Sequence, residues 1–172
     1  RWKEISSLNE ERIDGIPFIS RNKLYIFGGV QLNRISKSYA FKSTIEAIEI
    51  KDIMIKETWT QIRYENEDNP SLPRSLGGVV YAEDNLILIF GGQIQKGLLS
   101  DDILIFKEED DEINIDLGDL KLPKKTAFIE NNLSSLYKNF FGFDIFGDLF
   151  FYNTGTDMFH YMLNTNCLEE DN

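Results

Sequence analysis

The segment Asn22-Lys23-Leu24-Tyr25-Ile26-Phe27-Gly28-Gly29 recurs as Asn85-Leu86-Ile87-Leu88-Ile89-Phe90-Gly91-Gly92, 63 residues further along the chain. Each copy is a short run of strand-forming residues that ends on two glycines, which is typical of a strand entering a turn that needs positive φ or close backbone approach. A further step of 63 residues reaches Phe150-Phe151-Tyr152-Asn153-Thr154-Gly155, a run of the same character with one glycine. A fixed spacing of this kind predicts a protein built from repeated units of sheet.

The residues before each copy repeat as well. Gly15 and Gly78 each lie fourteen residues ahead of the second glycine of their copy and open an apolar run. Arg12 and Arg74 lie just ahead of these runs. In the third copy the corresponding run, Phe140 to Phe143, is displaced by about one residue. These runs predict a first strand in each unit, directly before the strand that carries the glycines.

Each unit also continues after its glycines. A variable loop is followed by a third strand, which we expect at Thr44 to Ile50, Asp102 to Phe106 and Met158 to Leu163. A fourth strand is expected in the first unit, at Trp59-Thr60-Gln61-Ile62. The similar pattern Trp2-Lys3-Glu4-Ile5 predicts the last strand of a preceding unit.

Four short strands per unit, with a glycine pair after the second and a tryptophan in the fourth, resemble the kelch repeat over nearly the whole chain. The sequence departs from that pattern at Thr154-Gly155 and near Leu120 to Leu122, where the second copy lacks the tryptophan. Its 63-residue spacing also exceeds the ~50 residues of a kelch repeat. We therefore expect long loops, at residues 30–43, 63–73, 108–112 and 124–138.

The resemblance implies an all-β fold, an incomplete kelch-type β-propeller of about three four-stranded antiparallel blades. The expected parts are the last strand of a preceding blade with its loop at 1–11, blades at 12–63 and 74–122, an inter-blade loop at 123–139, a degenerate blade at 140–168 and an acidic tail at 169–172. A propeller closes a ring of about four to eight blades, so we expect the remaining blades from the rest of a longer chain.

Composition narrows the classes of partner. The net charge of -11 disfavours nucleic acid and anionic membrane surfaces, because both require a basic face. The longest apolar run, Leu86 to Phe90, is far shorter than the ~20 residues of a membrane-spanning helix. Cys167 is the single cysteine, which excludes an internal disulfide. We expect a reducing, intracellular location such as the cytoplasm, with association to the cytoskeleton as one option.

Residues with catalytic chemistry are sparse. His160 is the only histidine, whereas a zinc site needs three or four ligands, so we expect a structural role for it. A packing role is the expectation for Cys167. The acidic run Glu108 to Glu112 lacks the ligand spacing of a calcium loop and is interpreted as a solvated hairpin tip. No helix or Lys-Ser/Thr pair follows the glycine pairs, so they form no phosphate loop. The sequence predicts no catalytic residue, metal ligand or cofactor.

The remaining candidates lie on a surface. In the kelch proteins that this chain resembles, the loops between strands two and three and those between blades emerge on one face. That face commonly binds a peptide or protein, with arginines near the first strand among the contacts. The resemblance therefore implies partner-binding roles for Arg12 and Arg74. The loops after the glycine pairs add Gln31, Asn33, Arg34, Gln93, Gln95 and Lys96.

Three functional hypotheses follow. The leading one is a non-catalytic protein-interaction or scaffolding module, acting as a substrate adaptor or as a component of a large assembly, which the long loops favour. The alternative is an enzyme on a kelch-type propeller, such as a sugar oxidase, epimerase or lyase, whose active site is completed by missing blades. A WD-type propeller is disfavoured because the sequence has paired glycines and no Trp-Asp at a strand end.

Overall fold

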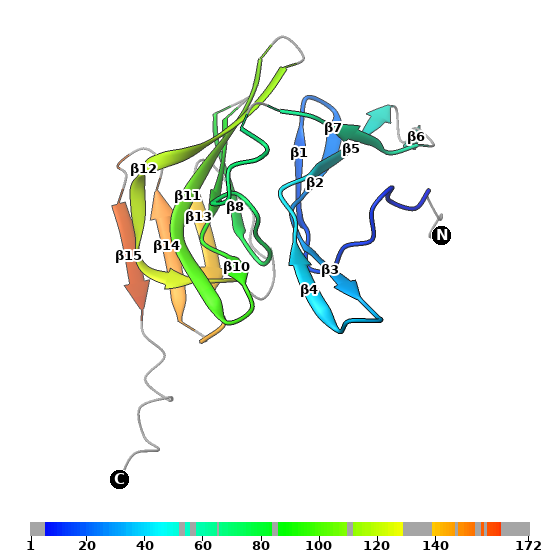
Figure 1. The fold of residues 1–172 in the computed structure, drawn as a ribbon. Coiled ribbons are helices and arrows are strands. Elements are labelled where there is room, and N and C mark those ends of the chain that lie inside the picture. The colour runs from blue at the N-terminus through cyan, green and yellow to red at the C-terminus, as the bar shows by residue number, and fades with distance from the viewer. Residues whose placement is uncertain are drawn as a thin grey trace.

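The computed structural model describes residues 6–51, 54–55, 58–64, 66–83, 86–109, 112–128, 139–146, 148–153, 156 and 158–162. In this part of the chain every regular element is a β-strand, and the strands pair in antiparallel sheets. Three main sheets follow one another along the chain and lie side by side (Figure 1). The prediction of an all-β fold is therefore confirmed.

Sheet 1 is a meander with an inserted hairpin. Its strands are β1 (Ile16–Ser20), β2 (Lys23–Phe27), β5 (Ile45–Lys51), β6 (Met54–Ile55) and β7 (Thr60–Ile62), and the inserted hairpin consists of β3 (Val30–Asn33) and β4 (Ser38–Phe41). β2 pairs with β1 and β5, while β6 and β7 pair with the other edge of β5. β3 and β4 pair with each other as a separate hairpin. The edge position of β1 explains why it tolerates Pro17, which has no backbone N–H to donate.

Sheet 2 repeats the order of sheet 1. Its strands are β8 (Gly78–Glu83), β9 (Leu86–Phe90), β10 (Gln93–Gln95), β11 (Leu98–Glu109) and β12 (Glu112–Thr126). The order across the sheet is β8-β9-β11-β12, with β10 paired to the first residues of β11. The β11–β12 hairpin is paired as far as Glu109 and Glu112, so the hairpin predicted at 108–112 is confirmed.

The spacing between sheets 1 and 2 is 63 residues for the second strand and 62 for the first. β2 and β9 begin at Lys23 and Leu86. Ile16 pairs with the last residue of β2, and Gly78 pairs with the last residue of β9. A register shift between Tyr81 and Glu83 takes up the additional residue in β8, as a β-bulge does. As a result, Gly77 rather than Gly78 holds the place of the glycine that precedes β1.

Sheet 3 does not follow the 63-residue spacing. It contains β13 (Asn139–Phe143), β14 (Leu149–Asn153) and β15 (Met158–Met162), in that order. The spacing predicts that β14 matches β2 and β9. Shortly after β2 and after β9, a backbone amide donates to a carbonyl in the segment that precedes the same sheet, from Val30 N to Ile13 O and from Gln93 N to Ser75 O. The corresponding bond in sheet 3 runs from Ile145 N to Ala127 O and follows β13. The strand predicted at 140–143 is present as β13, the first described strand of sheet 3, but by these bonds it matches β2 and β9 rather than β1 and β8.

The compact second unit explains this difference in spacing. Sheet 1 carries the β3–β4 hairpin between its second and third strands, whereas sheet 2 has the short β10–β11 turn. Sheet 2 also joins β11 directly to β12, whereas sheet 1 inserts β6 before β7. Matching positions in sheets 2 and 3, such as Gln93 and Ile145, are consequently 52 residues apart. Residues 129–138, which precede β13, lie outside the described residues.

Two apolar clusters join the three sheets. Between sheets 1 and 2, the rings of Phe18, Tyr25 and Phe106 pack with centroid distances of 4.8 to 5.4 Å. Between sheets 2 and 3, the ring of Phe90 packs against that of Phe159 at 6.4 Å. Sheet 2 is therefore apolar on both faces, which is the pattern of a sheet stacked between two neighbours.

Candidate functional site

One end of the sheets, which we call the loop face, carries the turns that follow the second strands. It comprises the β3–β4 hairpin, the β10–β11 turn, the β13–β14 turn and the segments 12–15, 74–77 and 126–128 that precede the sheets. In Figure 1 the β3–β4 hairpin and β10 lie at the bottom of the view, and the β11–β12 hairpin lies at the top. The loop face is the surface that the sequence predicts for partner binding.

The glycine pairs are required by the close packing of the segments around them. Gly28-Gly29 has φ angles of 65° and 91°, and Gly91-Gly92 has 55° and 95°. A Cβ on the first glycine would lie 2.2 Å from Arg74 O in one pair and 2.5 Å from Thr126 O in the other. The amide of the second glycine donates to that same carbonyl at 2.8 Å in both pairs. Each turn is thus bonded by its main chain to the segment that leads into the next sheet.

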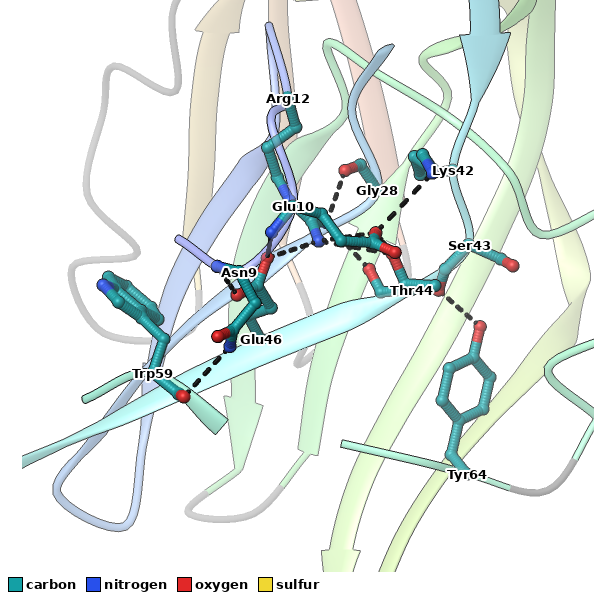
Figure 2. A network of polar contacts seen from close by, with 10 residues as sticks. All are labelled: Asn9, Glu10, Arg12, Gly28, Lys42, Ser43, Thr44, Glu46, Trp59 and Tyr64. Atoms are coloured by element: carbon teal, nitrogen blue, oxygen red, sulfur yellow. Dashed lines mark hydrogen bonds and ion pairs between the residues drawn. The ribbon is translucent and has the colours of Figure 1, made fainter. Parts of the chain in front are cut away.

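Arg12 lies inside a polar network at the start of sheet 1, which Figure 2 shows. Its side chain is 1% exposed. Nη1 donates to Gly28 O at 2.8 Å and to Thr44 O at 3.0 Å, and Nη2 donates to Glu46 Oε1 at 2.8 Å. The guanidinium therefore fixes the glycine turn of its own sheet.

Arg74 has the same position before sheet 2. It is fully buried, and its Nη1 donates to Gly91 O at 2.9 Å while Nη2 donates to Ser71 O at 3.0 Å. Burial lowers the pKa of Arg74 to about 10, so its guanidinium is charged at neutral pH. The expectation from kelch proteins is that Arg12 and Arg74 contact a partner. Both guanidinium groups instead bond carbonyl oxygens inside the protein, so we leave them out of the proposed binding surface.

Glu46 is a buried carboxylate that the sequence reasoning missed. It accepts hydrogen bonds from Asn9 N at 2.6 Å and Glu10 N at 3.1 Å, in addition to the bond from Arg12. The side-chain amide of Asn9 also donates to Trp59 O at 3.0 Å (Figure 2). The segment before sheet 1 that contains Asn9 and Glu10 is therefore bonded to β5 and to the residue before β7. A carboxylate within the apolar run Ile45-Glu46-Ala47-Ile48 was the available signal, because a buried charge needs a partner.

The six predicted loop residues lie on two neighbouring hairpins. They are Gln31 and Asn33 on β3, Arg34 in the β3–β4 turn, Gln93 and Gln95 on β10, and Lys96 in the β10–β11 turn. Asn33 Oδ1 accepts hydrogen bonds from two backbone amides of its own turn at 3.0 Å, so it shapes the hairpin. Arg34 is 80% exposed and pairs with Glu11 at 3.2 Å. Gln95 and Lys96 are exposed, whereas Gln31 and Gln93 are half-buried.

A groove of about 150 Å³ separates these two hairpins. Its lining residues are Ile13, Asp14, Val30, Tyr39, Phe41, Gln93 and Lys96. Lys96 Nζ lies 5.6 Å from the centre of the Tyr39 ring, which places a cation over an aromatic face across the groove. The structure thus brings Gln93 and Lys96 to one site, together with apolar residues that the sequence reasoning did not select. Tyr39 and Phe41, the two aromatic residues of the segment 30–43, were the signal for them.

A larger hollow of about 580 Å³ lies near the β11–β12 hairpin, at the other end of the sheets from the loop face. It is lined by Arg63, Tyr64, Lys107, Glu109, Glu112, Ile113 and Asn114. The Tyr64 hydroxyl donates to Ser43 O at 2.7 Å, and burial raises the pKa of Tyr64 well above its usual range. Two cations and two carboxylates line this hollow, so it favours no ligand of one charge.

The other residues singled out in the sequence give no cluster of reactive groups. His160 lies on β15, where its backbone pairs with Phe151. Cys167 lies outside the described residues. Glu108 departs from the predicted solvated tip, because its side chain is buried and pairs with Lys23 of sheet 1 at 3.2 Å. Within the described ranges, no group of three or more His, Cys, Asp or Glu residues is placed to hold a metal ion.

No protein-family model matches the sequence, and no curated protein matches it significantly. In the part of the chain that the structure describes, no helix is long and apolar enough to cross a membrane. The fold and the candidate site are therefore those of an all-β chain with three stacked antiparallel sheets and a grooved loop face.

Proposed function

We propose that this chain is a non-catalytic protein-interaction or scaffolding module, built as part of a kelch-type propeller within a larger protein or assembly. The order of strands supports the proposal, because sheets 1 and 2 are both antiparallel meanders with a glycine-pair turn after the second strand. The stacking of successive sheets face to face is also how the blades of a propeller pack.

The outer face of sheet 1, which points away from sheet 2, favours a further sheet packed against it. Ile87 and Ile89 of sheet 2 are 1% and 0% exposed, because sheet 1 covers them. The matching residues of sheet 1 are Leu24 and Ile26, which point away from sheet 2 and are half-buried. An apolar face of this kind is usually covered by another layer. In the proposed propeller a blade of the same kind covers it.

The observation that carries the binding role is the meeting of two exposed hairpins at the groove. The β3–β4 hairpin and the β10–β11 turn come from neighbouring sheets, and Lys96 of one lies over Tyr39 of the other. Loops held by a rigid sheet scaffold commonly carry binding residues, because the scaffold positions them while their side chains stay accessible. The proposed contact residues are Gln31, Arg34, Gln93, Gln95 and Lys96, with Asn33 holding the turn.

The partner in this proposal is a protein, and the location is the reducing interior of the cell. Nucleic acid and membrane insertion are not part of the proposal, since the chain carries a net charge of -11. Propeller blades completing the ring would come from the rest of the protein.

The test is capture of partners by the full-length protein in three forms. These are the natural protein, the double variant Arg34→Glu/Lys96→Glu, and the control Lys107→Glu, whose exposed lysine lies on β11 away from the loop face. Quantitative mass spectrometry should show proteins that the natural form and the control retain and the double variant loses. Equal capture by all three forms, or specific capture by none, would contradict the proposal.

A further inference from the structure

The groove on the loop face is walled by apolar side chains that remain open to solvent. Ile13 is 48% exposed and Tyr39 is 49% exposed, although each lies against the groove. Val30 and Phe41 are more deeply buried and line the same groove. A cavity with an apolar lining and a few polar groups at its margin suits an apolar side chain better than an ion.

The two hairpins that border the groove differ in charge from the rest of the chain. The sequence has 29 Asp and Glu residues against 18 Lys and Arg residues. Segments 30–42 and 93–99 contain no Asp or Glu, and their charged residues are Arg34, Lys37, Lys42 and Lys96. Local positive charge on an acidic protein attracts an acidic partner while the rest of the surface repels it.

The cations differ in how far they are already paired. Arg34 pairs with Glu11, and Lys42 lies 3.7 Å from Glu10. Among the residues that the structure describes, Lys37 and Lys96 form no ion pair. Asp14 is the carboxylate that lines the groove itself. The unpaired cations therefore lie on the hairpins rather than at the wall formed by the segment before sheet 1.

We propose that this groove binds an acidic peptide segment, with one apolar side chain of the peptide between Ile13, Tyr39 and Phe41 and its carboxylates facing Lys37 and Lys96. The proposal rests on the proposed function, and specifies the chemistry of its partner. The amide group of Gln93, which is half-buried on β10 and lines the groove, can donate to and accept from a peptide backbone.

The experiment measures fluorescence anisotropy of labelled peptide pools with the full chain. One pool is rich in Asp and Glu around a single Leu or Phe, a second replaces the acids by Lys and Arg, and a third keeps the acids but replaces the apolar residue by Ser. The first pool should bind, and the third should bind about tenfold more weakly, because it lacks the apolar anchor. Raising the salt concentration should weaken binding of the first pool, because the attraction is between exposed charges.

Variants of the chain connect this binding to the groove. Lys96→Glu and Tyr39→Ser should each weaken binding of the first pool by up to about fivefold, since exposed ion pairs and cation–π contacts are each worth up to about 1 kcal/mol. Lys107→Glu, the control on β11, should leave it unchanged, and circular dichroism should show that all variants fold. Equal binding of the acidic and basic pools, or equal loss in the control, would overturn the proposal. Partner capture that depends on Arg34 and Lys96 without acidic-peptide binding would overturn the peptide chemistry alone and leave the proposed function in place.

Discussion

Replacing Glu46 by leucine should detach the segment before sheet 1 from the sheet. The carboxylate is fully buried and accepts three hydrogen bonds, from Asn9 N, Glu10 N and Arg12 Nη2. Hydrogen bonds to a charged group are worth about 1.5–3 kcal/mol each. The sum over the three bonds is therefore an upper limit for the contribution of the carboxylate to the free energy of unfolding. Removing one partner of a buried ion pair costs about 3–5 kcal/mol, because the other charge stays buried. We therefore expect Glu46→Leu to lower the free energy of unfolding by about 3–5 kcal/mol.

The loss should come from the missing carboxylate and not from leucine in the strand. Leu104 is fully buried at the matching position, where it pairs with Ile89 as Glu46 pairs with Ile26. Glu46→Gln, which keeps one acceptor oxygen, should cost less than Glu46→Leu. The double variant Arg12→Met/Glu46→Leu should recover at least about 1 kcal/mol, because it also removes a buried guanidinium whose remaining ion pair is the one with Glu10 at 3.3 Å.

Urea unfolding followed by tryptophan fluorescence measures these differences. Trp59 is a suitable reporter because its Nε1 donates to Ser6 O at 2.9 Å, within the same network. A Glu46→Leu variant whose free energy of unfolding lies within about 0.5 kcal/mol of the natural chain would refute the reasoning, since a surface substitution has an effect of that size.

Three further expectations test other parts of the structure. Gly28→Ala should destabilise the fold by more than the ~1–2 kcal/mol of a left-handed non-glycine residue, because its Cβ would meet a carbonyl oxygen at 2.2 Å. Gly97→Ala, with φ of 77° and open space around it, should show the conformational cost alone, and equal losses in urea unfolding would contradict the clash. Burial raises the pKa of Glu108, but Ser20, Tyr25 and Lys23 more than offset this and hold it below 4.5. Its contribution to stability is therefore complete above about pH 4.5 and is lost as the pH falls through the lower folded pKa, so Glu108→Gln should flatten an acid unfolding curve in that window. Ile89→Ala should lower the free energy of unfolding by about 2–5 kcal/mol, because Ile89 is fully buried. Ile26→Ala should lower it less, because Ile26 is half-buried. Equal losses of thermal stability in the two variants would show that the outer face of sheet 1 is already covered.

Local pattern predicted most strands of the first two sheets, but not the β3–β4 hairpin, which lies in the segment 30–43 that was predicted as a loop. The runs that end at Phe27 and Phe90 become β2 and β9, because alternating apolar side chains on a strand are buried on both faces of a stacked sheet. The strands of sheet 3 lie close to where they were predicted, but the match of β13 with β2 and β9 was not predicted, because a constant spacing was assumed. The spacing depends on the loops, and loop length varies without changing the hydrogen bonds that define a strand's place.

The candidate site was predicted only in part, and the cause differs from that in sheet 3. Hairpin residues such as Arg34 and Lys96 are exposed, as their place in polar loops predicts. Arg12 and Arg74 are buried, because the turns they precede present carbonyl oxygens that need donors, and a guanidinium offers five. The groove depends on the distance between two hairpins from neighbouring sheets, and no local sequence pattern encodes that distance.

The bond from the second glycine of each pair to the segment before the next sheet joins neighbouring units through main-chain atoms. The residues that accept it, Arg74 and Thr126, have unrelated side chains, and the bond length is 2.8 Å in both. Mutations can therefore replace the accepting side chain while the junction between units survives. Repeats joined in this way would lose recognisable side-chain motifs faster than they lose their architecture.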